Sequence, residues 1–399
     1  MKIGIVKPDY KISGGFEVVV NRLKLELELR GHEVQMVYVD ATDTSTNDIP
    51  YIINQDMFYK NPEFFKYINM YWKYLKMDLS RYDAVISTQP PSFAIKHPKH
   101  ISLFYHHMKF FYDMSDLILE VGLQQPYHHK SVQVIREIDT LSLSKVTTIL
   151  AGSQTIKNRI KQFNNLSNNV DVIYAGIDPD IYYFNGQVIY EYPIVVGRHE
   201  FPKRPELFVK AMKLLPNLVG KVVGAGGRTD DLKRIDNLLT YTSQEGIVIT
   251  DDIVWKQMSN GKFGFEYEKL IQNAKKNRTP SNVIFTGRVS TESLFEEYSK
   301  ASCVVCPAYE EDYGLTAIEA MSFKKPVIAC KDGGGYAELI EDGINGFLVD
   351  PTSDAIAEAI QRIAENKEMA IRMGNAAYET SRKYTWRNTI DKLLEHLTF

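Results

Sequence analysis

The chain of 399 residues has little of several features that would narrow its class. It holds only three cysteines, so we expect a reducing compartment and no disulfide framework. It has no run of about eighteen uninterrupted apolar residues, which predicts that no segment spans a membrane. Its N-terminus shows no cationic region before a long apolar stretch, so no secretory signal is expected. These features predict a cytoplasmic protein.

Charge of one sign is also scarce. The formal net charge is -3 with 24% charged residues, so no basic excess points to nucleic acid as a partner. Short-period repeats and low-complexity segments are missing as well. At this length, two domains of about 150–200 residues each are expected.

Strand and helix patterns alternate along the chain and restart once. The first series begins at Lys2–Val6 and Glu33–Asp40, and the second begins at Tyr192–Arg198. This order predicts two α/β domains, each with a Rossmann-like, doubly wound parallel sheet, joined near residues 179–190. Residues 230–278 separate two strands and contain scattered aromatics, so they are expected to form an elaborated crossover and not a disordered loop.

The segment from Pro307 to Ala329 carries the strongest chemical pattern. Glu311 and Glu319 have seven residues between them. The first follows an apolar strand, and the second lies in the helix that the loop enters. A strand, a glycine-containing turn and a helix N-terminus favour an anion, because free N–H groups and the positive end of the helix face it. Two carboxylates beside such a site suit a sugar nucleotide.

Cys303 and Cys306 precede this segment and form a CxxC pattern. Residues i and i+3 of a strand face opposite sides of a sheet, so the two thiols cannot easily share a ligand. We therefore expect two buried core residues and no metal or redox pair.

These motifs resemble the retaining glycosyltransferases of family 4, which have the GT-B fold. The resemblance covers nearly the whole chain and is strongest from Ile284 to Pro351. It implies an acceptor-binding domain at residues 1–183, a nucleotide-sugar-binding domain at residues 184–380, and a helix at residues 381–399 that packs back on the first domain. The matching segments are the Gly14-Gly15 loop, "VGRHEFPKRPELFVKAM", "VIFTGRVSTESLFEEYSKASCVVCPA" and "ELIEDGINGFLVDP".

The resemblance implies roles for four charged residues. Arg198 and Lys203 match an Arg-x4-Lys pattern and would hold the donor diphosphate, where fixed cations neutralise the charge of the departing group. Glu319 would accept hydrogen bonds from the ribose hydroxyls. Glu311 would hold the donor sugar and place negative charge near a developing oxocarbenium ion.

Backbone groups would complete the donor site. The N–H groups of Tyr313, Gly314 and Leu315 would bind sugar or phosphate oxygens. The loop with Arg288 and Val289 would contact the nucleobase, without fixing which base.

The N-terminal half offers fewer candidate site residues. The Gly14-Gly15 loop would approach the donor phosphates or the acceptor, since glycine allows close approach of the backbone. The family has a histidine near the sugar, and here both His106 and His107 fit that place. Asp312 departs from the family, which often has glycine after the first glutamate, and leaves the contacts to the donor sugar open.

The implied reaction moves a sugar from a UDP- or GDP-sugar, GDP-mannose among them, to a hydroxyl acceptor. The route is a front-face substitution with retention, in polysaccharide, glycolipid or other glycoconjugate synthesis. The residues require no metal or other cofactor. The acceptor would be a carbohydrate or a lipid-linked glycan. Phe64–Lys76 would be an interfacial helix in peripheral contact with the membrane, or an ordinary amphipathic helix lining the acceptor cleft.

Three other readings remain open at this stage. A nicotinamide-dependent dehydrogenase would need G-x-G-x-x-G, but after Gly224 and Gly226 the chain has Thr229 where the last glycine should be. A glycoside hydrolase would use the two glutamates as acid and nucleophile. A catalytically weak sugar-nucleotide-binding protein would bind the donor without transfer. The base, sugar, acceptor, linkage and oligomeric state do not follow from the sequence.

Overall fold

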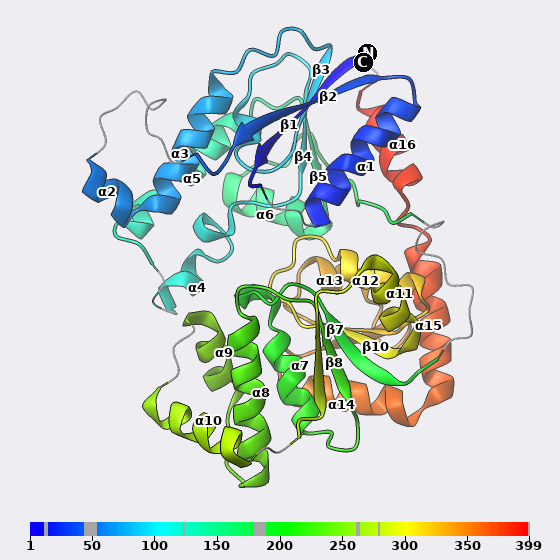
Figure 1. Ribbon diagram of the computed structural model, residues 1–399. Helices are drawn as coiled ribbons and strands as arrows, with labels where there is room; N and C mark the ends of the chain where they lie inside the picture. The colour runs from blue at the N-terminus through cyan, green and yellow to red at the C-terminus, as the bar shows by residue number, and fades with distance from the viewer. Residues whose placement is uncertain are drawn as a thin grey trace. The chain divides into compact units, whose positions relative to one another are not determined.

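The computed structural model describes residues 1–11, 15–43, 54–120, 122, 124–178, 189–260, 264–277 and 280–397. The chain divides into two compact units, the first formed by Met1–Gly176 with Trp386–Phe399 and the second by Ile177–Thr385. Each unit is built on a six-stranded, all-parallel sheet with flanking helices (Figure 1). The expected two-domain α/β fold is confirmed. The predicted boundary at 183/184 lies outside the described residues, seven residues after the division at Gly176, and the predicted boundary at 380/381 lies five residues before the division at Thr385.

The sheet of the first unit has the strand order β2-β1-β3-β4-β5-β6. Its interior strand β1 is buried on both faces, with Ile3, Ile5 and Val6 at 0% exposure, because helices cover the parallel sheet from both sides. The strands are β1 (Lys2–Asp9), β2 (Glu33–Asp40), β3 (Ala84–Ser87), β4 (His100–Phe104), β5 (Thr148–Ala151) and β6 (Val170–Val172).

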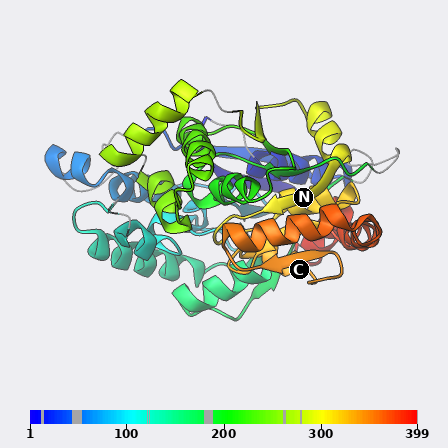
Figure 2. The same ribbon diagram turned by 90° about the horizontal axis from the view of Figure 1, so that it is seen from below.

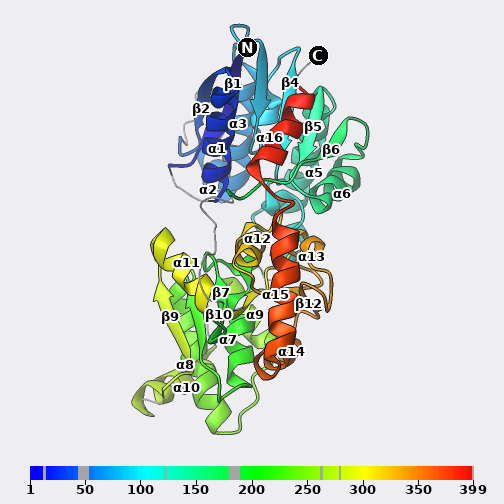
Figure 3. The same cartoon turned by 90° about the vertical axis from the view of Figure 1, so that its right-hand side faces the viewer.

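The last helix of the chain packs in the first unit. Helix α16 (Trp386–Glu395) lies beside α1 (Gly15–Leu29) in Figures 1 and 3. Arg30, just after α1, binds Asp391 at 3.2 Å, and Thr389 donates a hydrogen bond to the carbonyl of Tyr174 at 2.7 Å. The predicted return of the C-terminal helix to the N-terminal domain is confirmed. The other helices of this unit are α2 (Gln55–Lys60), α3 (Pro62–Leu75), α4 (Ser115–Glu120), α5 (His128–Leu143) and α6 (Gln154–Asn164).

Helix α3 contains the aromatic segment that the sequence offered as an interfacial helix. Its residues Tyr67, Met70 and Tyr74 are at most 3% exposed and pack in the core of the first unit. These side chains therefore stabilise the fold and are not presented to solvent. Over the residues that the structure describes, no helix is long and apolar enough to cross a membrane.

The sheet of the second unit has the order β12-β11-β10-β7-β8-β9. Strand β12 was not expected as a strand, although its residues lie in the motif "ELIEDGINGFLVDP". Helix α14 (Ser353–Glu365), orange in Figure 2, packs on β10 and β12. The strands are β7 (Tyr192–Val196), β8 (Gly220–Val223), β9 (Val283–Gly287), β10 (Ala301–Cys306), β11 (Val327–Cys330) and β12 (Gly346–Val349).

Strand order in the second sheet reverses beside β7. The chain moves from β7 through β8 to β9 on one side, then returns to β10 on the other side of β7 and continues outward to β12. In open α/β sheets, ligands bind outside the carboxyl ends of the strands at such a switch point. The loops after β7 and β10 are therefore the expected site.

The predicted elaborated crossover is helical in its described residues. It consists of α8 (Thr229–Gln244), α9 (Asp251–Asn260) and α10 (Phe265–Asn277). Trp255 of α9 packs against Phe201, with ring centroids 4.2 Å apart, so this region is tied to the loop after β7. The remaining helices of the unit are α7 (Pro205–Lys213), α11 (Thr291–Lys300), α12 (Leu315–Ser322), α13 (Gly335–Leu339) and α15 (Lys367–Ser381).

Cys303 and Cys306 lie in β10 and are 0% and 2% exposed. Burial raises the pKa of both thiols, that of Cys303 to about 12. They are core residues, as predicted.

Candidate active site

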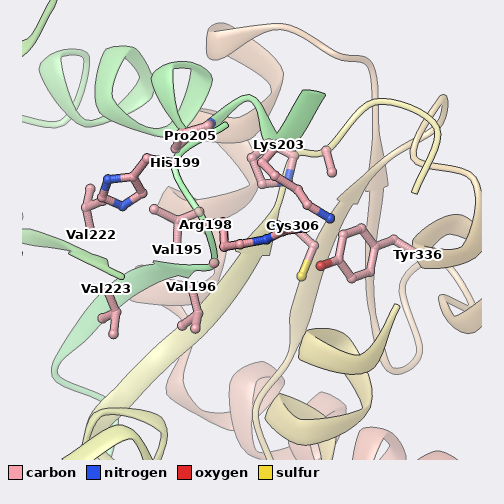
Figure 4. Close-up of a pocket in the computed structure, with 13 residues that line it drawn as sticks. Val195, Val196, Arg198, His199, Lys203, Pro205, Val222, Val223, Cys306 and Tyr336 are labelled. Carbon is pink, nitrogen blue, oxygen red and sulfur yellow. The ribbon is translucent and has the colours of Figure 1, made fainter. Parts of the chain in front are cut away.

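A small pocket opens at the carboxyl ends of β7 and β10, at the switch point of the second sheet. Figure 4 shows Arg198, Lys203 and Tyr336 around it. Both predicted phosphate-binding cations therefore lie at the place where the sheet topology favours a ligand. The lining residues are 195–199, 203, 205, 222–223, 306–308 and 336.

Lys203, which lines this pocket, forms an ion pair with Glu311. Lys203 ends the short 3-10 turn Phe201–Lys203 after β7, and Glu311 lies in the loop after β10. The ammonium of Lys203 donates a hydrogen bond to Oε2 of Glu311, with side chains 28% and 16% exposed. Arg198, just after β7, is exposed. The structure thus brings three of the four predicted charged residues to one strand-end region.

Three consecutive glycines support the Glu311 loop. The N–H of Glu311 donates to the carbonyl of Gly333 at 3.2 Å, and the N–H of Gly335 donates to the carbonyl of Glu311 at 2.7 Å. Gly334 has φ +57°, and a Cβ there would lie 2.4 Å from the Glu311 carbonyl oxygen. The sequence reasoning missed this support, although the triple glycine was a visible signal of close backbone approach.

The turn into α12 requires glycine. Gly314 precedes the helix with φ +94°, and a Cβ there would lie 2.9 Å from the side chain of Leu339. Tyr313 is 7% exposed, and Leu315 is the first residue of the helix. The three backbone N–H groups predicted to bind oxygens therefore lie at the helix N-terminus.

Glu319 has a buried partner that the sequence did not reveal. Tyr298 of α11 is 0% exposed, and its hydroxyl donates a hydrogen bond to Oε2 of Glu319 at 2.9 Å. Burial, followed by the charge of Glu319, raises the pKa of Tyr298 well above its usual value. The phenol therefore stays protonated and holds one carboxylate oxygen in place.

The glycine-rich turn after β8 is built against the loop after β7. Gly224 has φ +121°, and a Cβ there would lie 2.0 Å from the carbonyl oxygen of Gly197. A carboxylate oxygen of Glu200 accepts a hydrogen bond from the N–H of Gly227 at 3.0 Å, and Asp231 lies in the first turn of α8. Carboxylates thus face the N-terminus where a dinucleotide's pyrophosphate would bind, which argues against the dehydrogenase reading.

Arg288 and Val289 follow β9, two strands away from β7 in the sheet. Arg288 is exposed, and neither residue lines the pocket of Figure 4. Gly287 has φ +71°, and its carbonyl accepts a hydrogen bond from the N–H of Gly224 at 2.9 Å. The predicted nucleobase loop is therefore anchored to the turn after β8.

The structure separates the two candidate histidines after β4. His107 is 2% exposed, with Nε2 lying 2.8 Å from Oδ1 of Asn164 and its ring packed on Tyr112 at 4.2 Å between centroids. His106 is partly exposed, and its Nδ1 lies 2.8 Å from the carbonyl oxygen of His107. His107 is thus a core residue, and His106 is the partly exposed one of the two.

A buried carboxyl group lies behind His107. Asp139 of α5 is 1% exposed and accepts hydrogen bonds from the hydroxyls of Tyr67 and Tyr112, each at 2.9 Å. Burial raises the pKa of Asp139 to about 7, against the lowering effect of the two hydroxyls.

The predicted glycine loop of the first unit is described only in part. Gly14 lies outside the described residues, and Gly15 begins α1.

Comparisons with known proteins agree with this architecture. Residues 13–181 match the family described as Glycosyltransferase Family 4, and residues 261–380 match the family Glycosyl transferases group 1. An uncharacterized glycosyltransferase of Methanocaldococcus jannaschii is 26% identical over 243 residues, covering 61% of this chain and 56% of that protein. The D-inositol 3-phosphate glycosyltransferase of Mycolicibacterium smegmatis is 26% identical over 278 residues, covering 66% of this chain and 53% of that protein. The matches thus span little more than half of these relatives.

Solved structures extend the likeness over the whole chain. The sucrose-phosphate synthase of Thermosynechococcus elongatus has a TM-score of 0.69 at 19% identity, covering 99% of this chain and 98% of that one. Anabaena HepE in complex with UDP-glucose has a TM-score of 0.64 at 17% identity, covering 100% and 99%. At such identities the likeness shows the fold. Together with the family matches, it shows that the chain belongs to the family 4-type glycosyltransferases with the GT-B fold.

Proposed function

We propose that this protein transfers a sugar from a nucleoside diphosphate donor to a hydroxyl acceptor and retains the anomeric configuration. The observation that carries the proposal is the ion pair between Lys203 and Glu311, beside Arg198 at the switch point of the second sheet. Cations for a diphosphate and a carboxylate for sugar hydroxyls then stand at one place.

Each charged group has a distinct task in this proposal. Arg198 and Lys203 bind the diphosphate, whose negative charge competes with Glu311 for the ammonium of Lys203. Released in part from that pair, Glu311 accepts hydrogen bonds from the donor sugar. Glu319, held by Tyr298, accepts them from the ribose. The loop with Arg288 and Val289 contacts the base.

The chemical step is a front-face substitution. The bond from the anomeric carbon to the diphosphate oxygen breaks, and the acceptor oxygen bonds to the same face while the departing diphosphate takes its proton. Fixed cations stabilise the charge on the leaving group, so we propose that no divalent metal is needed. The ion pair of Glu311 with Lys203 suits a binding group better than the nucleophile of a glycoside hydrolase.

The donor and acceptor are proposed from the relatives. HepE has been solved with UDP and UDP-glucose, and one relative is the O-antigen chain mannosyltransferase C of Escherichia coli. We therefore propose a UDP-sugar first and GDP-mannose second, with a glycan or lipid-linked acceptor in polysaccharide or glycolipid synthesis. A cytoplasmic location with peripheral membrane contact belongs to the same proposal. Binding to anionic vesicles at low salt tests that contact.

The decisive experiment measures nucleoside diphosphate released from UDP-, GDP- and ADP-sugars, with and without EDTA. We expect release from one donor class, unchanged by EDTA, and stabilisation by the matching nucleotide in thermal shift. Binding without release would favour the catalytically weak sugar-nucleotide binder. Cleavage of glycosides without nucleotide, or turnover of a nicotinamide cofactor, would refute the proposal.

A further inference from the structure

Arg204 is a buried arginine with an unusual backbone. It is 6% exposed and has φ 46° and ψ 39°, the left-handed region that favours glycine. An arginine in this conformation is strained and persists only where surrounding contacts hold it there. The contacts of its side chain are therefore expected to offset that strain.

The guanidinium of Arg204 bridges the loops that follow two other strands. Its Nε donates to the carbonyl of Pro307 at 2.7 Å, and Nη2 donates to the carbonyl of Ala308 at 3.3 Å. It also forms a two-pronged pair with Asp332, from Nη1 to Oδ2 at 2.9 Å and from Nη2 to Oδ1 at 2.5 Å. Such bidentate pairs fix orientation as well as distance. One side chain thus joins the turn after β7 to the loops after β10 and β11.

Glu311 lies on the loop that these contacts enclose. On one side, the N–H of Tyr309 donates to the carbonyl of Pro202 at 2.8 Å. On the other side, the N–H of Glu310 donates to the carbonyl of Asp332 at 2.9 Å. The loop is therefore held between the two segments that Arg204 connects.

We propose that Arg204 and Asp332 form a clamp that positions the carboxylate of Glu311 against Lys203 and the donor sugar. Arg204 is then a positioning residue, which acts through Glu311 and does not touch the donor. This role rests on the proposed function. The ribose half of the donor depends on Glu319 of α12, which Arg204 does not contact in any of its hydrogen bonds.

If the clamp acts through Glu311, its loss should lower turnover but leave UDP binding nearly unchanged. Arg204→Gly removes the guanidinium at a position whose φ suits glycine. Arg204→Lys keeps the positive charge but cannot form the bidentate pair with Asp332. Both variants should bind UDP within about threefold of wild type, while the turnover number falls about tenfold or more. Arg382→Lys is the matched control, because Arg382 pairs with Glu379 on the surface with both side chains about two-thirds exposed.

Asp332→Asn tests the other half of the clamp. It should reproduce the loss of turnover, and the double variant Arg204→Lys/Asp332→Asn should be little worse than either single variant, because the pair acts as one unit. A purely structural role would lower turnover and UDP-binding capacity in proportion. Proportional losses, or wild-type turnover in Arg204→Gly, would overturn the clamp.

Hydrogen exchange tests the clamp without any substrate. The amides of residues 309–311 should exchange at least tenfold faster in Arg204→Gly than in wild type or Arg382→Lys. Unchanged exchange overturns the clamp, whatever the activity. Faster exchange in a protein whose wild type releases no nucleotide from any sugar donor supports the clamp and refutes the proposed function.

Discussion

The two units share a parallel-sheet architecture and differ in the polar groups beside their strand ends. In the second unit, the ion pair of Lys203 with Glu311 is partly exposed. In the first unit, the polar network behind His107 is buried, with Asp139 held by two tyrosine hydroxyls. Exposed ion pairs can exchange a partner for a ligand, whereas a buried and satisfied network fixes shape. This difference supports the proposal that the donor binds at the second unit, and it indicates a structural role for the network behind His107 in the first.

Removing a cation from the second unit should have the largest effect. We expect Lys203→Ala or Arg198→Ala to lower kcat by about 10²–10³, since each removes one fixed group that stabilises the leaving diphosphate. Steady-state assay of nucleotide release measures this. Lys300→Ala is the control, because Lys300 pairs with Glu296 at the surface of the same unit. Near-normal turnover in both site variants would refute the assignment.

Each unit contains a buried carboxyl group that should make its stability depend on pH. Glu206 in α7 of the second unit is 0% exposed, and no other residue in the described ranges donates a hydrogen bond to it. Burial raises its pKa from 4.5 to about 8, against smaller lowering by its own backbone N–H and by Arg204. The folded state thus keeps a proton that the unfolded state loses, so stability falls as pH rises from about 4.5 to 8 and then levels off.

Glu206→Gln should remove that pH dependence. Relative to wild type, the free energy of unfolding of the variant should rise progressively between pH 5 and 8, and the difference should reach on the order of a few kcal/mol above pH 8. Asp139→Asn is the matched variant in the first unit, where the pKa of about 7 places the change between about pH 4 and 7. Urea unfolding across this range measures both. A constant difference between Glu206→Gln and wild type at every pH would contradict the prediction.

Of the two histidines after β4, we expect substitution of His106 to lower activity and substitution of His107 to lower stability. His106 is partly exposed, so His106→Ala should lower kcat/KM about tenfold, as loss of one positioned polar group would, with little change in thermal midpoint. His107→Ala should lower the thermal midpoint, because it leaves a cavity and removes the hydrogen bond to Asn164. If His107→Ala folded normally and His106→Ala were fully active, the division would be wrong.

The smallest expected effect concerns one hydrogen bond. Tyr298→Phe removes the phenol that holds Glu319, and we expect the Kd for UDP to rise about fivefold to tenfold with kcat nearly unchanged. Calorimetric titration with UDP measures it. Tyr192→Phe is the matched control, since Tyr192 donates to Glu297 at 3.0 Å outside the pocket. Equal losses of affinity in both variants would show that Tyr298 has no special role.

Local patterns were enough to predict much of the fold. The segments at Glu33–Asp40 and Tyr192–Val196 are strands as expected. Tyr192–Val196 was readable because its middle residues are buried between helix layers and are all apolar. The turn at Gly314 and the helix after it were equally readable, since the signals are close in the sequence.

Contacts between distant residues could not be predicted in this way. Arg204 meets Asp332 across 128 positions, and Tyr298 meets Glu319 across 21. Nothing local distinguishes either pair from ordinary surface or core residues. His106 and His107 are adjacent and chemically identical, and only the packing of the first unit separates a core residue from a partly exposed one.

The return of α16 to the first unit bears on how the chain is made. Every residue of the second unit is synthesised before Trp386, where α16 begins. While the ribosome adds those residues, α1 lacks the helix that packs against it, and the carbonyl of Tyr174 lacks the hydroxyl of Thr389. The first unit to leave the ribosome is therefore the last to be completed, and a nascent chain stalled before Trp386 should present α1 to chaperones.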